Sequence, residues 1–115
     1  MKQPDWHDWP VLARCSIAPE HPALAGHFPG HPVLPGALLL DWACCTLAGE
    51  QPVDLREARF VRPCRPGSRL ALRAHTDTNT NASRFVITLI KEDGETLAVS
   101  GMLAPLPTNT NGSPL

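Results

Sequence analysis

The sequence predicts an α+β domain in which one apolar helix packs against a largely antiparallel sheet of about four to six strands. Residues 36–48 form a helix-length segment that is apolar on nearly every side. Several segments between residues 53 and 104 alternate apolar and polar side chains, which is the pattern of half-buried strands. Turn signals separate these segments, and Asp93-Gly94 is a strong hairpin signal.

The first expected strand runs from Val11 to Ile17 and places alternate residues on one apolar face. Residues 18–36 follow, with five prolines and three glycines. Proline fixes φ and removes a backbone donor, so this segment is expected to be a loop. Long loops inside compact domains are often functional, and we expect a function here.

The helix is expected over residues 36–48. Pro35 suits the first helical position, and Gly49 suits the residue that caps the C-terminus. Only Asp41 and Thr46 interrupt the apolar surface. A helix that is hydrophobic all round must be buried all round, so we expect the sheet to enclose it.

The later strands follow from their alternation. Their expected core-facing residues fall into three sets: Leu70, Leu72 and Ala74; Phe85, Ile87 and Leu89; and Leu97, Val99 and Leu103. Ala71 is small enough to be tolerated on the solvated face of its strand. Residues 1–104 are expected to form one domain, and residues 105–115 a disordered tail.

The composition excludes several classes of function. The net charge of −1, with three Phe, three Trp and no Tyr, argues against nucleic-acid binding. The longest apolar stretch is interrupted and is shorter than the roughly 20 residues that span a bilayer. The N-terminus does not resemble a secretory signal, and a cytoplasmic location with four small buried thiols is expected. No CxxC pair is present, which disfavours a cysteine zinc site.

Three residues together suggest acid–base chemistry beside a carbonyl group. His27 lies in the proline-rich loop, where a neutral imidazole suits a general base, although a single histidine is more often a surface residue. Asp41 lies in the apolar helix, and a carboxyl shielded from water holds its proton more readily and suits a general acid. The Gly36 N–H at the helix start suits an oxyanion. The alternatives are that Asp41 only hydrogen-bonds a neighbouring loop and that glycine stands at position 36 only because the turn geometry requires it.

A metal site at His21, His27 and His31 is disfavoured. Pro29, Gly30 and Pro32 prevent the helix on which a His-x₃-His pair usually binds a metal.

The segment GHFPGHPVLPGALLLDWA, residues 26–43, resembles the signature of the hot-dog-fold 3-hydroxyacyl-[acyl-carrier-protein] dehydratase family. That signature is a GHFPxxPVxPG loop followed by an apolar helix, with an acid fourteen residues after the histidine, as Asp41 is after His27. FVRPCRPGSRL, residues 60–70, is similar to the family's second motif, F-x-RPV-x-PGD-x-L. The resemblance covers residues 11–103, and in size the chain is similar to the aryl-polyene-type branch.

The resemblance implies a central helix wrapped by a curved antiparallel sheet, in dimers that share one continuous sheet. It implies that His27 removes the C2 proton of a 3-hydroxyacyl thioester and that the partner subunit's Asp41 protonates the departing hydroxyl. The Gly36 N–H would hold the thioester oxygen, and the Val33 carbonyl would orient the imidazole. No metal or organic cofactor is implied. The product would be a 2-enoyl thioester, in fatty-acid-like or polyene biosynthesis.

Three features depart from the family pattern. Asp41 stands where the branch with the GHFPG loop usually has glutamate, Trp42 where alanine is common, and Cys45 where glutamine is common. The acyl chain length and the double-bond geometry therefore stay open.

Residues 56–73 contain six arginines and one acid, a local charge of +5 in a near-neutral chain. This asymmetry suggests an acidic partner, and the resemblance supplies an acyl carrier protein that would dock at Arg62, Arg65 and Arg69. The alternative is an ordinary solvated strand face.

Two other functions fit the sequence. One is a hot-dog acyl thioesterase, in which an acid activates water. The other is a weakly active partner subunit of a heteromeric dehydratase, and homodimers and heterodimers both stay open.

Overall fold

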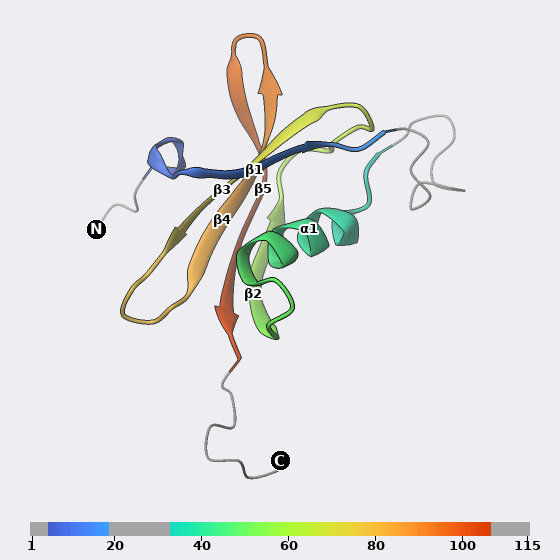
Figure 1. The fold of residues 1–115 in the computed structure, drawn as a ribbon. Coiled ribbons are helices and arrows are strands. Elements are labelled where there is room, and N and C mark those ends of the chain that lie inside the picture. The colour runs from blue at the N-terminus through green and yellow to red at the C-terminus, as the bar shows by residue number, and fades with distance from the viewer. Residues whose placement is uncertain (1–4, 19–32, 107–115) are drawn as a thin grey trace.

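The computed structural model describes residues 5–18 and 33–106, and its single sheet has the strand order β1-β3-β4-β5-β2, with every pair antiparallel (Figure 1). The elements in chain order are η1 (Trp6–Asp8), β1 (Val11–Ser16), α1 (Gly36–Ala48), β2 (Val53–Phe60), β3 (Arg69–Thr76), β4 (Ser83–Lys91) and β5 (Gly94–Pro105). Within the described residues, one α-helix and five antiparallel strands confirm the predicted α+β class.

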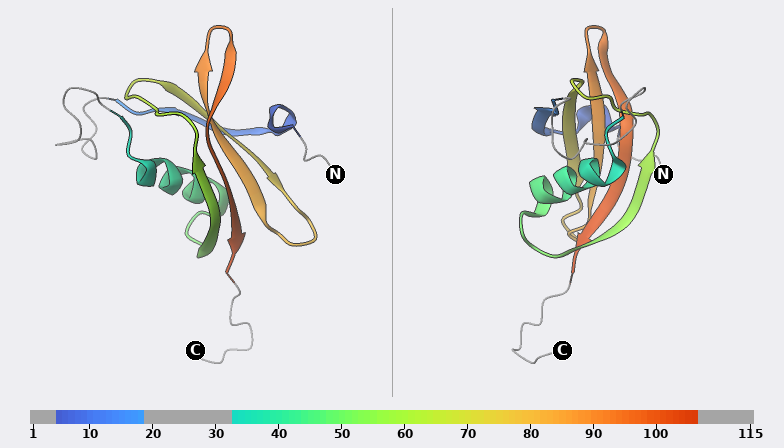
Figure 2. Two further views of the ribbon diagram at one scale, coloured as in Figure 1. Left: turned by 180° about the vertical axis from the view of Figure 1, so that it is seen from behind. Right: turned by 90° about the vertical axis from the view of Figure 1, so that its right-hand side faces the viewer.

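Consecutive hairpins place β3, β4 and β5 at the centre of the sheet, while β1 and β2 form its two edges. The sheet is strongly twisted, and α1 lies on one face of it, next to β2 and β4 (Figure 2). The face that contacts α1 is called the inner face below, and the opposite face is called the outer face.

The signals that bound the helix act as expected. Pro35 is the N-cap, one position earlier than predicted, and the N–H groups of Leu38 and Leu39 donate to its carbonyl. The helix ends at Ala48 and is capped by Gly49, whose φ of 62° favours glycine and whose N–H donates to Cys45 O at 2.8 Å. The Asp93-Gly94 turn is also confirmed, because Gly94 begins β5 with a φ of 132°.

The hydrophobic core lies between α1 and the inner face. Leu34, Leu39 and Ala43 form the helix side of it. The sheet contributes Leu70, Leu72, Ala74, Phe85, Ile87, Leu89, Ala98, Val99 and Leu103. The alternation in β1 is confirmed as well, because Ala13, Cys15 and Ile17 pack against this core while the residues between them are exposed.

Two predictions about individual side chains are wrong, one about direction and one about exposure. A bulge in the β4–β5 pairing, where Ile87 faces Val99 but Thr88 faces Leu97, places both Ala98 and Val99 in the core and leaves Leu97 out of it. Ala71 is buried rather than solvated.

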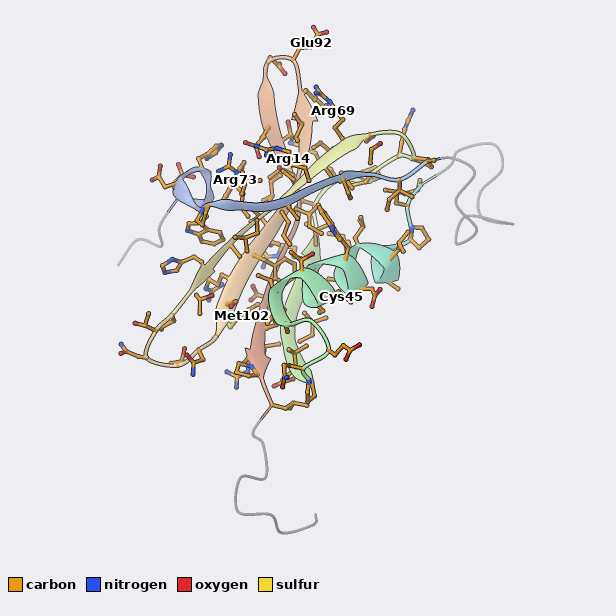
Figure 3. The ribbon with its side chains drawn as sticks, in the orientation of Figure 1. Arg14, Cys45, Arg69, Arg73, Glu92 and Met102 are labelled. Atoms are coloured by element: carbon orange, nitrogen blue, oxygen red, sulfur yellow. The ribbon has the colours of Figure 1, made fainter. Side chains whose placement is uncertain are left out.

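The outer face is covered in part by the N-terminal segment, and hydrogen bonds from Arg73 hold this segment against the sheet. The Arg73 guanidinium donates to the carbonyls of His7, at 3.1 Å, and Trp9, at 2.7 Å, and makes two hydrogen bonds to the Glu95 carboxylate. The Thr88 hydroxyl also donates to Glu95, at 2.7 Å. Arg73 is labelled beside η1 in Figure 3.

The expectation that the sheet encloses the helix on all sides is wrong for a single chain. Only Leu39 and Ala43 of α1 are buried, while Ala37, Asp41 and Cys45 lie exposed on its far side. A five-stranded sheet on one side of a helix can cover only the face turned toward it, so the remaining apolar surface stays open.

The expected tail lies largely outside the described residues, and β5 extends to Pro105.

Candidate active site

The segment that leads into α1 is fixed against the chain that follows β2. The N–H of Leu34 donates to the carbonyl of Cys64 at 2.7 Å, and both residues are buried in the core. This hydrogen bond sets the entry of the chain into the helix, and it places Val33 and Gly36 beside the end of β2.

Gly36 is in direct contact with an aromatic ring. A Cβ atom built at position 36 would lie 2.8 Å from Cζ and 2.9 Å from Cε1 of Phe60. Such distances are closer than van der Waals contact, so the ring occupies the space that any other side chain would need. The first N–H groups of a helix have no intrahelical acceptor and carry the positive end of the helix dipole. Gly36 therefore brings a polarised backbone donor next to an apolar surface.

These residues line a groove of about 520 Å³. Val33, Leu34 and Gly36 form one side of it, and Phe60, Val61 and Arg62 form the other. Phe60 and Val61 are about half exposed. The groove therefore combines apolar walls, a helix N-terminus and one cationic side chain, which is an arrangement suited to an acyl thioester.

Asp41 does not line this groove. It is exposed, one helical turn before Cys45, whose Sγ lies 3.8 Å from its Oδ1. The expectation that Asp41 is shielded from water is thus wrong for a single chain, because Asp41 lies on the face of α1 that the sheet leaves open. Cys45, labelled in Figure 3, is also exposed, contrary to the expectation that all four thiols are buried.

The other three cysteines are at least half-buried, and all four are free thiols. Burial raises the pKa values of Cys15, Cys44 and Cys64, so these thiols are less readily ionised than usual.

His27 lies outside the described residues, as do His21 and His31. The structure thus brings together two of the four predicted site residues, Val33 and Gly36, and places Asp41 elsewhere on the same helix. Within residues 5–18 and 33–106, no three His, Cys, Asp or Glu side chains gather where they could hold a metal ion.

The three arginines predicted to dock a carrier protein are exposed. Arg62 and Arg65 lie between β2 and β3, and Arg69, labelled in Figure 3, begins β3. In the described part of the chain none of the three forms an ion pair, whereas Arg56 and Arg73 do. The arginine cluster is therefore divided, and Arg73 serves the fold of the outer face.

Phe60 is the site residue that sequence reasoning missed. It belongs to the second family-like motif, but nothing in a linear sequence shows that its ring meets Gly36. That contact depends on how the end of β2 lies against the start of α1.

Comparisons with known proteins show which proteins this chain is similar to. The family described as "ApeI-like: ApeI dehydratase" matches residues 4–101. The 3-hydroxyacyl-[acyl-carrier-protein] dehydratase FabZ of Anaeromyxobacter sp. (strain Fw109-5) is 33% identical over 84% of this chain and 71% of that protein. The FabZ protein of Wolbachia sp. subsp. Drosophila simulans (strain wRi) is 34% identical over 56% of this chain and 54% of that protein.

Solved structures show the same fold. The dehydratase heterocomplex ApeI:P from Xenorhabdus doucetiae is similar with a TM-score of 0.65 and 24% identity, over 82% of this chain and 84% of that chain. The hexameric thioesterase y2039 from Yersinia pestis gives a TM-score of 0.64 with 13% identity, over 94% of both chains.

None of the helices in the described residues is long and apolar enough to cross a membrane. The fold is the predicted hot-dog fold, and the matches to the family and to its FabZ relatives decide the class of enzyme. The chain belongs to the ApeI-like family of dehydratases.

Proposed function

We propose that this dehydratase removes water from a 3-hydroxyacyl thioester carried on an acyl carrier protein and gives the 2-enoyl thioester. The observation that carries the proposal is the groove at the start of α1, where the Gly36 N–H meets an apolar wall. The FabZ relatives are named for this reaction, which supports the choice of substrate.

In the proposed reaction His27 takes the C2 proton while the Gly36 N–H holds the thioester oxygen, on which negative charge develops. The C3–O bond then breaks, Asp41 gives its proton to the departing hydroxyl, and water leaves as the C2–C3 double bond forms. The imidazole ends protonated and the carboxyl ionised, and exchange of one proton with solvent restores both. The Val33 carbonyl would orient the imidazole.

We further propose that each site joins His27 of one protomer to Asp41 of its partner. The open side of α1 supports this arrangement, because Asp41 is exposed there beside apolar and small residues. The edge strand β2 supports it as well, since Leu55 and Phe60 on that strand are exposed large apolar side chains. A second subunit over these surfaces would shield Asp41 from water, as a general acid requires.

The partner of this chain is a copy of itself or a related dehydratase. The solved structure from Xenorhabdus doucetiae is named as a dehydratase heterocomplex, which supports testing both pairings. Turnover by the purified chain alone, compared with turnover after the related dehydratase chain is added, separates them.

The reaction is tested by mass spectrometry of carrier-bound 3-hydroxyacyl substrates. The wild type should release water and leave the acyl group on the carrier, whereas a thioesterase would release a free thiol. His27→Ala and Asp41→Asn should each lose the activity. Comparable loss of water with all three proteins would contradict the assigned roles.

The shared site has a sharper test. In dimers formed at random from equal amounts of the His27→Ala and Asp41→Asn chains, half are mixed and each mixed dimer holds one intact site, so about a quarter of wild-type activity should return. A mixture that stays as inactive as either variant would rule out a site made from two copies of this chain.

Carrier docking is proposed for Arg62, Arg65 and Arg69. Their exposure, their lack of carboxylate partners in the described part of the chain and the position of Arg62 at the groove support this surface. Arg62→Glu with Arg65→Glu should raise KM for carrier-bound substrate and leave kcat largely unchanged. Unchanged kinetics would refute the docking surface.

A further inference from the structure

The outer face of the sheet contains a hollow of about 670 Å³ that has no part in the proposed reaction. Its walls include His75, Arg84 and Met102, which alternate along their strands with the core residues Ala74, Phe85 and Leu103. The hollow therefore lies across the sheet from α1. The turn that joins β3 to β4 closes one end of it, and Trp9 of the N-terminal segment forms part of its wall.

The indole N–H of Trp9 has no hydrogen-bond acceptor among the described residues. The side chain of Trp9 is only 8% exposed, and its indole Nε1 is the one buried side-chain nitrogen or oxygen without a partner among the described residues. An orphaned buried donor of this kind destabilises a fold, and its indole N–H signal reports on any ligand that packs against the ring. The Trp9 ring also stacks on His75, with ring centroids 6.0 Å apart, so its position is fixed.

Two arginines bring further donors to the same hollow. Arg56 is the extra residue of a bulge in the β2–β5 pairing, between Leu55 and Glu57, and a bulge changes the direction of its side chain. Its Nε lies 3.3 Å from the Asp54 carboxylate, and Nη1 of Arg84 lies 3.7 Å from Glu57. Each exposed ion pair engages one guanidinium nitrogen, so most of the five N–H donors of each arginine are still available.

The remaining wall residues add a hydroxyl group, a carboxylate and an apolar side chain to the hollow. Thr80 accepts from the N–H of Ala82 and keeps its own proton to donate. Asp77 is the one acid in the wall, and one of its oxygens already accepts from Asn79 N at 2.8 Å. Met102, which is labelled in Figure 3, adds apolar surface to the wall.

We infer that this hollow binds a small molecule that carries an oxyanion group, phosphate or carboxylate, attached to an apolar portion. The oxyanion accepts hydrogen bonds from Arg56 and Arg84, and the apolar portion packs against the Trp9 ring and Met102. Guanidinium groups suit this task, because their planar donors match the geometry of phosphate and carboxylate.

The test follows the three indole N–H signals of the ¹⁵N-labelled full chain by NMR, with Trp9→Phe used to assign the Trp9 signal. The probes are phenyl phosphate, benzoate and uncharged benzyl alcohol. Phenyl phosphate or benzoate should move the Trp9 signal saturably, and whichever binds more tightly identifies the oxyanion. No saturable movement with either anion, or equal affinity for benzyl alcohol, would overturn the inference.

Strand β2 offers a matched control. Arg56 and Arg59 are both exposed on β2, but Arg59 does not line this hollow. Arg56→Gln should weaken binding of the anion by roughly tenfold, since a hydrogen bond to a charged group is lost, whereas Arg59→Gln should change it by less than about twofold. Equal weakening in both variants would mean that only the general positive charge attracts the anion, and it would overturn the site.

A stability measurement gives an independent test. Trp9→Phe removes the orphaned donor but keeps most of the apolar ring. In anion-free buffer, the lost packing of the larger ring and the removal of the orphaned donor have opposite effects on its unfolding free energy, so the test is the effect of the anion, which should raise its Tm less than that of the wild type. An anion-induced rise in Tm as large in Trp9→Phe as in the wild type would count against the site.

Discussion

Substituting Gly36 by alanine separates the chemistry of the groove from the stability of the fold. The new methyl group would lie 2.8 Å from Cζ and 2.9 Å from Cε1 of Phe60. Phe60 is 52% exposed, so its ring can turn aside at little cost. The ring would then move into the groove, and the methyl group itself would stand where the thioester oxygen approaches the backbone N–H.

We expect Gly36→Ala to have a small effect on the unfolding free energy and a large effect on kcat. Position 36 does not have a positive φ, and alanine is a good helix residue, so the unfolding free energy should change by less than about 1 kcal/mol. Alanine keeps the backbone N–H, but its methyl group should keep the thioester oxygen away from that donor; loss of one oxyanion donor typically costs about 10²–10³-fold in kcat, so we expect a decrease of roughly 10²-fold in Gly36→Ala.

Gly101→Ala is the matched comparison. Its Cβ would lie 2.5 Å from Cζ of Phe85, which is buried, and 2.7 Å from the backbone oxygen of Glu57. Neither neighbour can move aside freely, so overpacking should cost about 1–3 kcal/mol and lower Tm by about 5–15 °C.

The assays are thermal unfolding followed by circular dichroism and turnover of carrier-bound substrate below the Tm of each variant. Near-normal turnover in Gly36→Ala would refute the close approach of the thioester oxygen to position 36. A Tm loss as large as that of Gly101→Ala would show instead that the contact with Phe60 is structural.

Three more expectations concern the outer face and the thiols. Arg73→Gln should lower the unfolding free energy, measured in urea, by about 2–3 kcal/mol, because the Glu95 carboxylate, only 20% exposed, loses its partner. Arg56→Gln breaks a half-exposed ion pair and should cost less than about 1 kcal/mol. Equal costs for the two variants would refute the difference between the buried and the exposed pair. Hydrogen bonding from Arg73 holds the pKa of Glu95 below its usual 4.5, so this pair stabilises the fold above that pH and progressively less as pH falls through the lowered value. Glu95→Gln should therefore flatten the acid side of the stability profile, and an unchanged slope would contradict the assignment. Alkylation of the native chain, followed by peptide mass spectrometry, should leave Cys64 slow to react, because it is 1% exposed and burial raises its pKa. Cys45 is exposed in the single chain and should react quickly there, but slowly once the proposed partner covers the open side of α1. Rapid labelling of Cys64, or rapid labelling of Cys45 in the assembled dimer, would contradict these assignments.

Local signals in the sequence predicted much of the fold. Pro35 and Gly49 bound the helix, since each fixes or permits a particular backbone conformation, and Asp93-Gly94 marks the hairpin between β4 and β5. Alternation identified the core faces of β1 and β3, because successive side chains of a strand point to opposite sides. These rules depend on neighbouring residues only, and they held where the pairing between strands is regular.

These local rules failed where a bulge shifts the register between two paired strands. The bulge at Ala98 shifts the β4–β5 register and moves Leu97 off the core side. No local sequence pattern around Leu97 predicts this bulge. The bulge at Arg56 likewise depends on how β2 pairs with β5. A register shift belongs to the pair of strands, so alternation within either strand cannot reveal it.

The amino-acid sequence alone determined the class of fold, the bounds of the helix and the dehydratase family, because these depend on periodicity, on backbone-restricting residues and on a motif with fixed spacing. The tertiary structure decided that Phe60 closes over Gly36, that one side of α1 stays open around Asp41, and that Arg73 fastens the N-terminal segment over the outer face. Each of these depends on contacts between residues distant in the chain, and such contacts exist only after the strands have paired and the helix has packed on the sheet.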